Sequence, residues 1–424
     1  MMQPIFAIDW VDAGPSVDRL SEATMANLEI NLNGAPLISV LNRRTRSHRQ
    51  ALTVPLLPLA EWVVSNWWFL WHEMEDLQNE PRPGFEARHN FAHASDGFVY
   101  PNISATPIGE EVLLRVKPCR LTHSPLEFIG HGEHYIPGFV FEAELRDFVE
   151  TVIQRLWDWN LSDSRLEADW NAVNKLDSEE QVFCQAAAML GVDPWEAGDE
   201  LSDAIVKVWN NSDPMLREDM LASADAETLD SVVNWVSKTE HKTPEGGGPK
   251  WDELRQHTLA TNKAQRPWER GYELARAVRQ AMGNPRGRLG LDSSGPWAIG
   301  YETEDEVPRR VEGLVAAKAP SCLIRQKGEA GQRFLLARAA GDYLSRPNGS
   351  ASLLTSLSSP RQRQSRAFAA ELLVPKEELK ERIGSSSAVG EAAIADWAEE
   401  YGVSSYVVHH QIKNHGLAAV METD

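Results

Sequence analysis

Alternating apolar and polar positions predict strands in the first third of the chain. In residues 28–41, LEINLNGAPLISVL, this alternation runs on both sides of Asn33-Gly34. The pattern is typical of a β-hairpin, because Asn-Gly suits the left-handed turn that joins two antiparallel strands. Residues 103–116 repeat it around Gly109. We therefore expect a β-rich domain over residues 1–140.

One segment of this domain has helical periodicity instead. After Pro58, the apolar residues of 59–74 recur every three or four positions on one helical face. Four tryptophans fall in ten of these positions: Trp62, Trp67, Trp68 and Trp71. Such a helix either packs on the sheet as part of the core or lines an apolar groove that binds a ligand.

Residues 141–264 predict helices. The run SEEQVFCQAAAML follows Asp177, and Glu180 stands three positions after it, as in a capping box. Residues 226–239 form a second amphipathic candidate. The segment 242–250, KTPEGGGPK, then breaks all periodicity and is the best linker in the chain. We expect an α+β multidomain protein in which residues 265–424 fold as a unit.

The charge of the chain is unevenly distributed. The net charge is −20, from 42 Lys and Arg against 62 Asp and Glu. Residues 266–424 hold 21 of these basic and 20 of these acidic residues (net +1), which leaves −21 for residues 1–265. A field of this sign repels phosphate backbones, so nucleic-acid binding by residues 1–264 is disfavoured in general. The excess negative charge either keeps the protein soluble or favours a basic protein partner.

Other features of composition point to a soluble, cytoplasmic protein. The three cysteines, Cys119, Cys184 and Cys322, are far apart and form no metal-binding pair, which suits a reducing compartment. The N-terminal segment lacks the basic start of a signal peptide, and no apolar stretch is long enough to cross a membrane. We expect no membrane association.

The last third carries the most specific pattern. Residues 332–344, QRFLLARAAGDYL, resemble the active-site helix of the ImmA/IrrE zinc peptidases, RFTLAHELGHYL. SRAFAAELLVPKEEL (365–379) is similar to the second signature of that family, and 397–417 resembles its closing helix pair. PWERGYELARAVRQAMG (267–283) resembles its opening helix. The resemblance covers about residues 265–424 and implies a zincin-like fold.

The resemblance also shows which chemistry is missing. A zinc peptidase of this type needs two histidines one helical turn apart, a glutamate beside the first as general base, and a third ligand. The two histidine positions are Arg338 and Asp342, and the glutamate position is Ala339. The third ligand falls at Gln362 or Gln364. Because a guanidinium offers no lone pair to a metal, we expect no catalytic residue, metal or other cofactor here.

The arginines around this helix suggest another use. Arg338, Arg361, Arg363 and Arg366, with Arg346 beside them, could gather in the former zinc cleft as a site for phosphates or carboxylates. The alternative is a solvated basic face. Family members commonly cleave a helix-turn-helix repressor, so a version without ligands is expected to bind such a regulator, or a component of a phage-defence system, without cutting it. Stress response or mobile-element control in bacteria is the context that this resemblance implies.

Two other functions remain open. An enzyme could have its site in residues 1–264, where HGEHY places His131, Glu133 and His134 together without a third ligand. Residues 393–416 have the spacing of a helix-turn-helix, but its second helix offers Lys413 as the only cation to contact DNA. His409, His410 and His415 are better interpreted as surface or packing residues than as metal ligands, because adjacent helical positions diverge by about 100°.

Overall fold

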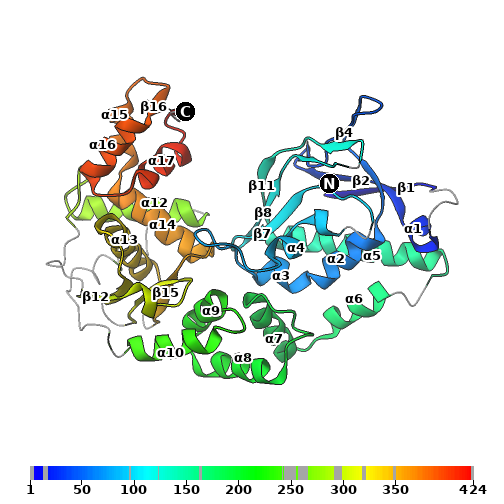
Figure 1. Cartoon of the computed structure of the whole chain (residues 1–424), viewed down its shortest axis with the longest axis horizontal. Coiled ribbons are helices and arrows are strands. Elements are labelled where there is room, and N and C mark those ends of the chain that lie inside the picture. Colours follow the sequence, from blue (N-terminus) through cyan, green and yellow to red (C-terminus); the bar gives the residue numbers. More distant parts are fainter. Residues whose placement is uncertain are drawn as a thin grey trace. The chain divides into compact units, whose positions relative to one another are not determined.

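The structure is a computed structural model of the whole chain. It describes residues 4–12, 18–94, 97–122, 124–161, 165–240, 242, 255, 266–290, 298–317, 321–346 and 350–421. These form two compact units, which we call unit 1 (residues 1–75 and 80–197) and unit 2 (residues 76–79 and 198–424). Helices and small sheets occur in both (Figure 1), and the fold is α+β, as the sequence predicts.

Unit 1 contains three small antiparallel sheets. In the first, β2 pairs with β1, β3 and β6, and the other two follow the orders β5-β4-β10-β9 and β11-β8-β7. The Asn33-Gly34 hairpin is confirmed, since both residues adopt positive φ between paired strands β2 and β3. The strand bounds are β1 Phe6–Trp10, β2 Met25–Leu32, β3 Ala35–Pro36, β4 Val40–Asn42, β5 Ser47–Arg49, β6 Leu52–Pro55, β7 Ile103–Pro107, β8 Glu111–Val116, β9 Cys119–Arg120, β10 Leu126–Phe128 and β11 Gly132–Pro137.

Most helices of unit 1 share one apolar core with these sheets, but α4 and α7 do not contribute to it. The Trp-rich segment forms two helices rather than one, because the chain leaves helical geometry at Asn66 (φ −106°, ψ 13°). Trp62 and Trp67 are buried in the core, which supports a packing role for this segment. The bounds are α1 Arg19–Ala23, α2 Leu57–Ser65, α3 Trp67–His72, α4 Phe85–His89, η1 Phe91–His93, α5 Gly138–Asp158, α6 Arg165–Lys175 and α7 Ser178–Met189. The capping box at Asp177 is confirmed.

Unit 2 is built around a four-stranded sheet of order β12-β14-β13-β15. Strand β12 pairs parallel to β14, whereas β13 is antiparallel to both β14 and β15. Its strands are β12 Ala298–Glu302, β13 Val311–Val315, β14 Ser321–Arg325 and β15 Ser352–Thr355, and β16 Ala388–Gly390 pairs separately with β17 Ala419–Met421. Its helices are α8 Asp199–Asn211, α9 Pro214–Ser223, α10 Leu229–Glu240, α12 Pro267–Ala281, η2 Glu304–Glu306, α13 Glu329–Ser345, α14 Pro360–Leu373, α15 Lys376–Ile383, α16 Glu391–Tyr401 and α17 Ser405–Asn414.

Helices α12, α13 and α14 pack closely because glycines lie where they cross. A Cβ on Gly271 of α12 would lie 2.3 Å from the carbonyl oxygen of Gln364, and one on Gly341 of α13 would lie 2.5 Å from the ring of Phe368. Helix α14 therefore meets α12 through its backbone and α13 through the side chain of Phe368. This contact brings residues 360–366 against α13, where the candidate site lies.

The boundaries of the compact units differ from the three segments that the sequence suggests. Within residues 141–264, α5 to α7 belong to unit 1, whereas α8 to α10 belong to unit 2. The reason is side-chain burial: α5 buries its apolar face in the core of unit 1, and α9 packs against β15. Apart from Lys242, the predicted linker 242–250 lies outside the described residues. No helix in the described residues is long and apolar enough to cross a membrane.

Candidate functional site

Arg338, at the first histidine position of the family motif, is fully enclosed. Its side chain comes from the middle of α13 and is 0% exposed. One guanidinium nitrogen, Nη1, forms an ion pair with Glu312 of β13. The other, Nη2, donates to the side-chain oxygen of Gln362 at 2.6 Å and to the carbonyl oxygen of Thr355 at 2.9 Å. Arg338 is therefore a buried cation whose guanidinium is bonded to the chain on both terminal nitrogens.

Glu312 balances this charge. Burial alone would raise the pKa of the Glu312 carboxyl, but the nearby charges of Arg338 and Lys327 outweigh burial and lower it to about 2. Lys327 Nζ lies 2.8 Å from the Glu312 carboxylate and is partly exposed. Glu312 is thus ionised at neutral pH and holds Arg338 in place. An ion pair of this kind is costly to break, because removing one partner leaves the other charge buried.

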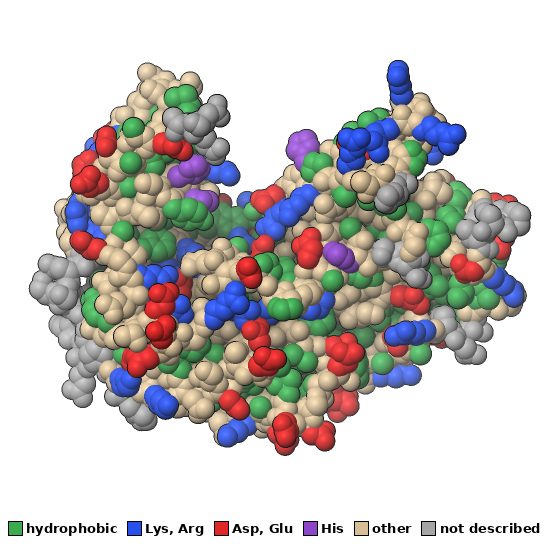
Figure 2. All heavy atoms as spheres, viewed as in Figure 1, with side chains coloured by type: hydrophobic (Ala, Val, Ile, Leu, Met, Phe, Trp, Pro, Cys, Tyr) green, Lys and Arg blue, Asp and Glu red, His purple; other side chains and the backbone are tan. Residues whose placement is uncertain are grey.

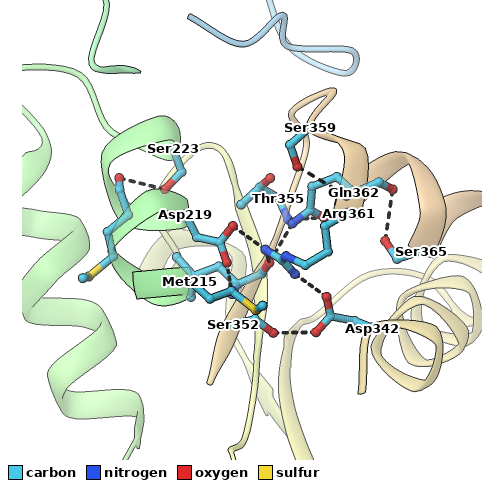
Figure 3. Close-up of polar contacts among 12 residues, drawn as sticks. Met215, Asp219, Ser223, Asp342, Ser352, Thr355, Ser359, Arg361, Gln362 and Ser365 are labelled. Atoms are coloured by element: carbon cyan, nitrogen blue, oxygen red, sulfur yellow. Dashed lines mark hydrogen bonds and ion pairs between the residues drawn. The ribbon is translucent and has the colours of Figure 1, made fainter. Parts of the chain in front are cut away.

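Asp342, at the second histidine position, is the centre of a second buried network (Figure 3). Its carboxylate is 0% exposed and accepts hydrogen bonds from Arg361 and, at 2.5 Å, from Ser352. Burial alone would raise its pKa, but Arg361 and Arg346 hold it below the ordinary value. Arg361 also forms an ion pair with Asp219 of α9. Two carboxylates from distant segments therefore share one guanidinium.

The two candidates for the third ligand position are separated by the geometry of α14. Gln362 is buried, and its side-chain oxygen accepts from Arg338 and from the backbone amide of Thr355, at 3.1 Å. Gln364 lies on the side of α14 that faces Gly271 of α12. Gln362 is therefore the residue that faces α13, and both ends of its side-chain amide already have partners.

Strand β15 forms an edge of the sheet, but its outer side is closed by side chains. The Leu353 amide donates to Asp219 at 2.8 Å, and the Leu353 carbonyl accepts from Arg361 at 3.0 Å and from Gln362 at 2.7 Å. The Thr355 amide donates to Gln362, and the Thr355 carbonyl accepts from Arg338 and Arg366. An exposed edge strand can pair with an added peptide strand. Here each of these backbone groups already has a partner.

The other arginines of the expected anion set are also bonded within the protein. Arg366 donates to the carbonyl oxygens of Leu357 and Thr355, both at 2.7 Å. Arg363 Nε donates to the carbonyl of Ser358 at 3.0 Å. Arg346 donates to backbone carbonyls and to Ser352. The arginines lie around β15 and α14, and carboxylates and carbonyls of the chain are placed against them.

These residues do not fit a zinc ion. Ala339, at the position of the general base, is buried in the apolar core. The three ligand positions carry the guanidinium of Arg338, the carboxylate of Asp342 bonded to an arginine, and the amide of Gln362, whose hydrogen bonds are already made. In the part of the chain that the structure describes, no group of three or more His, Cys, Asp or Glu side chains is arranged to hold a metal ion.

The weaker histidine signals also resolve into local contacts. Glu133 of HGEHY forms an ion pair with Arg115 at 3.0 Å, and His134 lies in β11. His410 stacks on Tyr406 with ring centroids 4.1 Å apart. His415 lies against Tyr272 and 3.4 Å from Glu371, where it joins α14 to the end of α17.

Unit 1 contains one buried ionic cluster that the sequence did not indicate. Glu73 is 0% exposed, and Arg88 donates to both of its oxygens, at 2.7 and 2.5 Å. His89, also fully buried, lies 3.3 Å from the same carboxylate and 2.8 Å from the Ala105 carbonyl. Burial opposes ionisation of Glu73, but Arg88 and His89 lower its pKa to about 2. The cluster ties α4 to β7, and Arg88 is its partly exposed member.

No protein-family model matches the chain, and no curated protein matches it significantly. We therefore infer function from the contacts of Arg338, Asp342 and Gln362. Sequence reasoning did not identify Glu312 and Asp219, the two carboxylates that complete the site. A signal existed for both: Glu312 stands in a strand whose other residues are apolar or glycine, and Asp219 lies on the face of α9 that carries Leu216 and Met220.

Proposed function

We propose that unit 2 is a non-catalytic, ImmA/IrrE-like module that binds a protein partner. The observation that carries this proposal is the buried ion pair of Arg338 and Glu312. It occupies the place where the family motif has its first zinc ligand, with Ala339 at the position of the base. A guanidinium supplies neither a ligand nor a proton acceptor for water. Regulation of phage defence, stress response or a mobile element is the role that the family resemblance suggests.

The closed edge of β15 adds a second argument against cleavage. A peptidase commonly holds its substrate as an extended strand along a sheet edge, through backbone hydrogen bonds. At Leu353 and Thr355 these bonds are made by Asp219, Gln362 and arginines. A partner is therefore expected to bind on the outer surface of unit 2 and not in the former cleft.

The helix pair α16–α17 is the surface that we favour for this partner. Its inner residues, Val407, Val408 and Ile412, are buried, and Gln411 donates to Glu371 of α14 at 3.1 Å. The opposite face presents Tyr406, whose side chain is 69% exposed. Exposed aromatic side chains are common anchors in protein interfaces. The single cation of α17, Lys413, argues against DNA as its ligand.

The test captures a partner and then measures whether the protein cleaves it. The full-length protein and the Tyr406→Ser variant are used as baits in the native host, and the captured protein is then produced and mixed with each bait. We expect a stable complex with the wild-type protein and one weakened about tenfold or more by Tyr406→Ser. The mass of the partner should stay unchanged on incubation. Shortening of the partner by the purified protein would contradict the proposal.

A further inference from the structure

The β4–β5 hairpin of unit 1 is the local exception to an acidic chain. From Ile30 to Ala60 the sequence contains no Asp or Glu, but it contains four arginines between positions 43 and 49. Strands β4 and β5 form an antiparallel hairpin at one end of the sheet β5-β4-β10-β9. Basic side chains gather over this hairpin at the upper right of Figure 2. The hairpin therefore concentrates positive charge in a stretch of sequence that has no acidic residue.

The tip of the hairpin is shaped by its own hydrogen bonds. The side-chain oxygen of Asn42 accepts from the amides of Arg44 and Thr45, at 3.0 and 3.2 Å. The hydroxyls of Thr45 and Ser47 lie 2.8 Å apart. Arg46 adopts a left-handed conformation, with φ 54°. The backbone thus has a defined turn before any ligand binds, and the Arg44 and Arg46 side chains extend from it into solvent.

One arginine anchors the hairpin and three remain available. Arg43 donates to the Ser124 carbonyl at 3.1 Å and lies 3.8 Å from Glu127. Arg44, Arg46 and Arg49 are exposed. Arg120, on β9 of the same sheet, is exposed as well. Among the residues that the structure describes, no carboxylate lies within ion-pair distance of these four exposed arginines. These four guanidiniums therefore form no ion pair with the described residues of unit 1.

We propose that this hairpin binds the phosphate backbone of a nucleic acid. The planar guanidinium donates paired hydrogen bonds to phosphate oxygens, and all four basic residues of the tip are arginine. The tip offers hydroxyls and amides but no exposed apolar side chain. Protein interfaces depend on apolar or aromatic anchors, whereas nucleic-acid interfaces are more polar and more positive. A two-stranded ribbon also matches the width of a major groove.

The negative charge elsewhere sets the character of this binding. Unit 1 holds 14 Lys and Arg against 28 Asp and Glu, a net charge of −14, so a polyanion is repelled by most of this unit and approaches at the hairpin. Few phosphates are then contacted, so the salt dependence of binding reflects about three charges. With three arginines in contact, affinity for duplex DNA should fall by roughly 40-fold between about 50 and about 200 mM salt. This inference concerns unit 1 and is independent of the function proposed for unit 2.

The test uses the full chain and a short fluorescein-labelled DNA duplex, followed by fluorescence anisotropy. The hairpin variant is Arg44→Ala with Arg46→Gly, since glycine tolerates the positive φ at position 46. The matched control is Arg19→Ala with Arg165→Ala, which removes the same charge from exposed positions of unit 1. Single-stranded DNA and duplex RNA are measured in parallel to find which phosphate backbone binds best.

We expect the hairpin variant to weaken binding about tenfold or more, and to reduce the salt slope by about 2, with the control near wild type. Its melting temperature should match that of the wild-type protein. Three outcomes would overturn the proposal: no binding of any nucleic acid by the wild-type protein at low salt, equal losses in the variant and the control, or equal competition by polyglutamate. The last result would assign the hairpin to an acidic protein.

Discussion

Replacement of Arg338 by methionine tests whether Arg338 and Glu312 form a structural ion pair. Arg338→Met keeps most of the side-chain volume but removes the charge opposite Glu312. Breaking a buried pair by removing one partner costs about 3–5 kcal/mol, because the remaining charge has lost its compensation. Lys327, on the exposed side of Glu312, offsets part of this cost. The estimate therefore belongs at the lower end of that range.

Calorimetry of the full-length protein measures this loss. For a unit of more than 200 residues, 3 kcal/mol lowers the melting temperature by roughly 6–12 °C. The two compact units need not unfold together, so the transition of unit 1 serves as an internal reference. The control Arg309→Met removes an exposed arginine from the same unit and should change the free energy of unfolding by less than about 0.5 kcal/mol.

A double variant separates the ion pair from simple packing. Arg338→Met with Glu312→Met removes both charges, and apolar replacements of a buried pair are often neutral or stabilising. We expect the double variant to recover most of the stability that the single variant loses. The reasoning would be refuted if Arg338→Met cost less than about 1 kcal/mol, since Arg338 would then not be a buried partner of Glu312.

Four further predictions follow from the same contacts. The pKa of Glu312 is lowered from 4.5 to about 2. Its contribution to the free energy of unfolding is therefore complete above pH 4.5 and is lost as the pH falls toward 2. Unfolding measured across this pH range should show a loss of about 3 kcal/mol in the wild-type protein and none of it in Glu312→Gln. A fragment of residues 198–424 should unfold cooperatively in calorimetry, whereas one of residues 266–424 lacks α9 and should melt at least about 10 °C lower or fail to fold, because Asp219 no longer caps β15. Gly271→Ala should destabilise unit 2 by about 1–3 kcal/mol in urea unfolding through its clash with α14, and Gly331→Ala, which meets only a lysine side chain, should cost less. The combined change Arg338→His, Ala339→Glu and Asp342→His should not restore cleavage of a casein-type substrate, because Gln362 remains an amide at the third position.

Local signals in the sequence predicted local structure well. The Asn33-Gly34 hairpin, the Asp177 capping box and the amphipathic helix α10 depend on neighbouring residues, and all three are confirmed. The Trp-rich helix was predicted as one element, but it divides at Asn66. Period and composition carry no information on such a break when the apolar residues continue on both sides.

The sequence predicted the residues that α13 and α14 contribute to the candidate site, but not the carboxylates that bind their arginines. Arg338, Asp342 and Gln362 stand out in the sequence because the motif that it resembles has other residue types at these three positions. Their partners Glu312 and Asp219 come from segments 26 and 142 residues away from the arginines they bind. No spacing rule connects such positions, and only the packing of α9 and β13 shows that carboxylates neutralise the arginines. The sequence did not predict that residues 141–264 are divided between two units, because this division also depends on contacts between distant segments.

Metal content tests the central claim most directly. The protein is purified without chelators, dialysed against a buffer with trace zinc, and its metals are measured by plasma mass spectrometry alongside casein cleavage. Because the buried positions around α13 hold a guanidinium, an engaged carboxylate and an amide, we predict far less than one zinc per chain and no cleavage that a chelator removes. About one zinc per chain, lost on substitution of Asp342, would contradict the account.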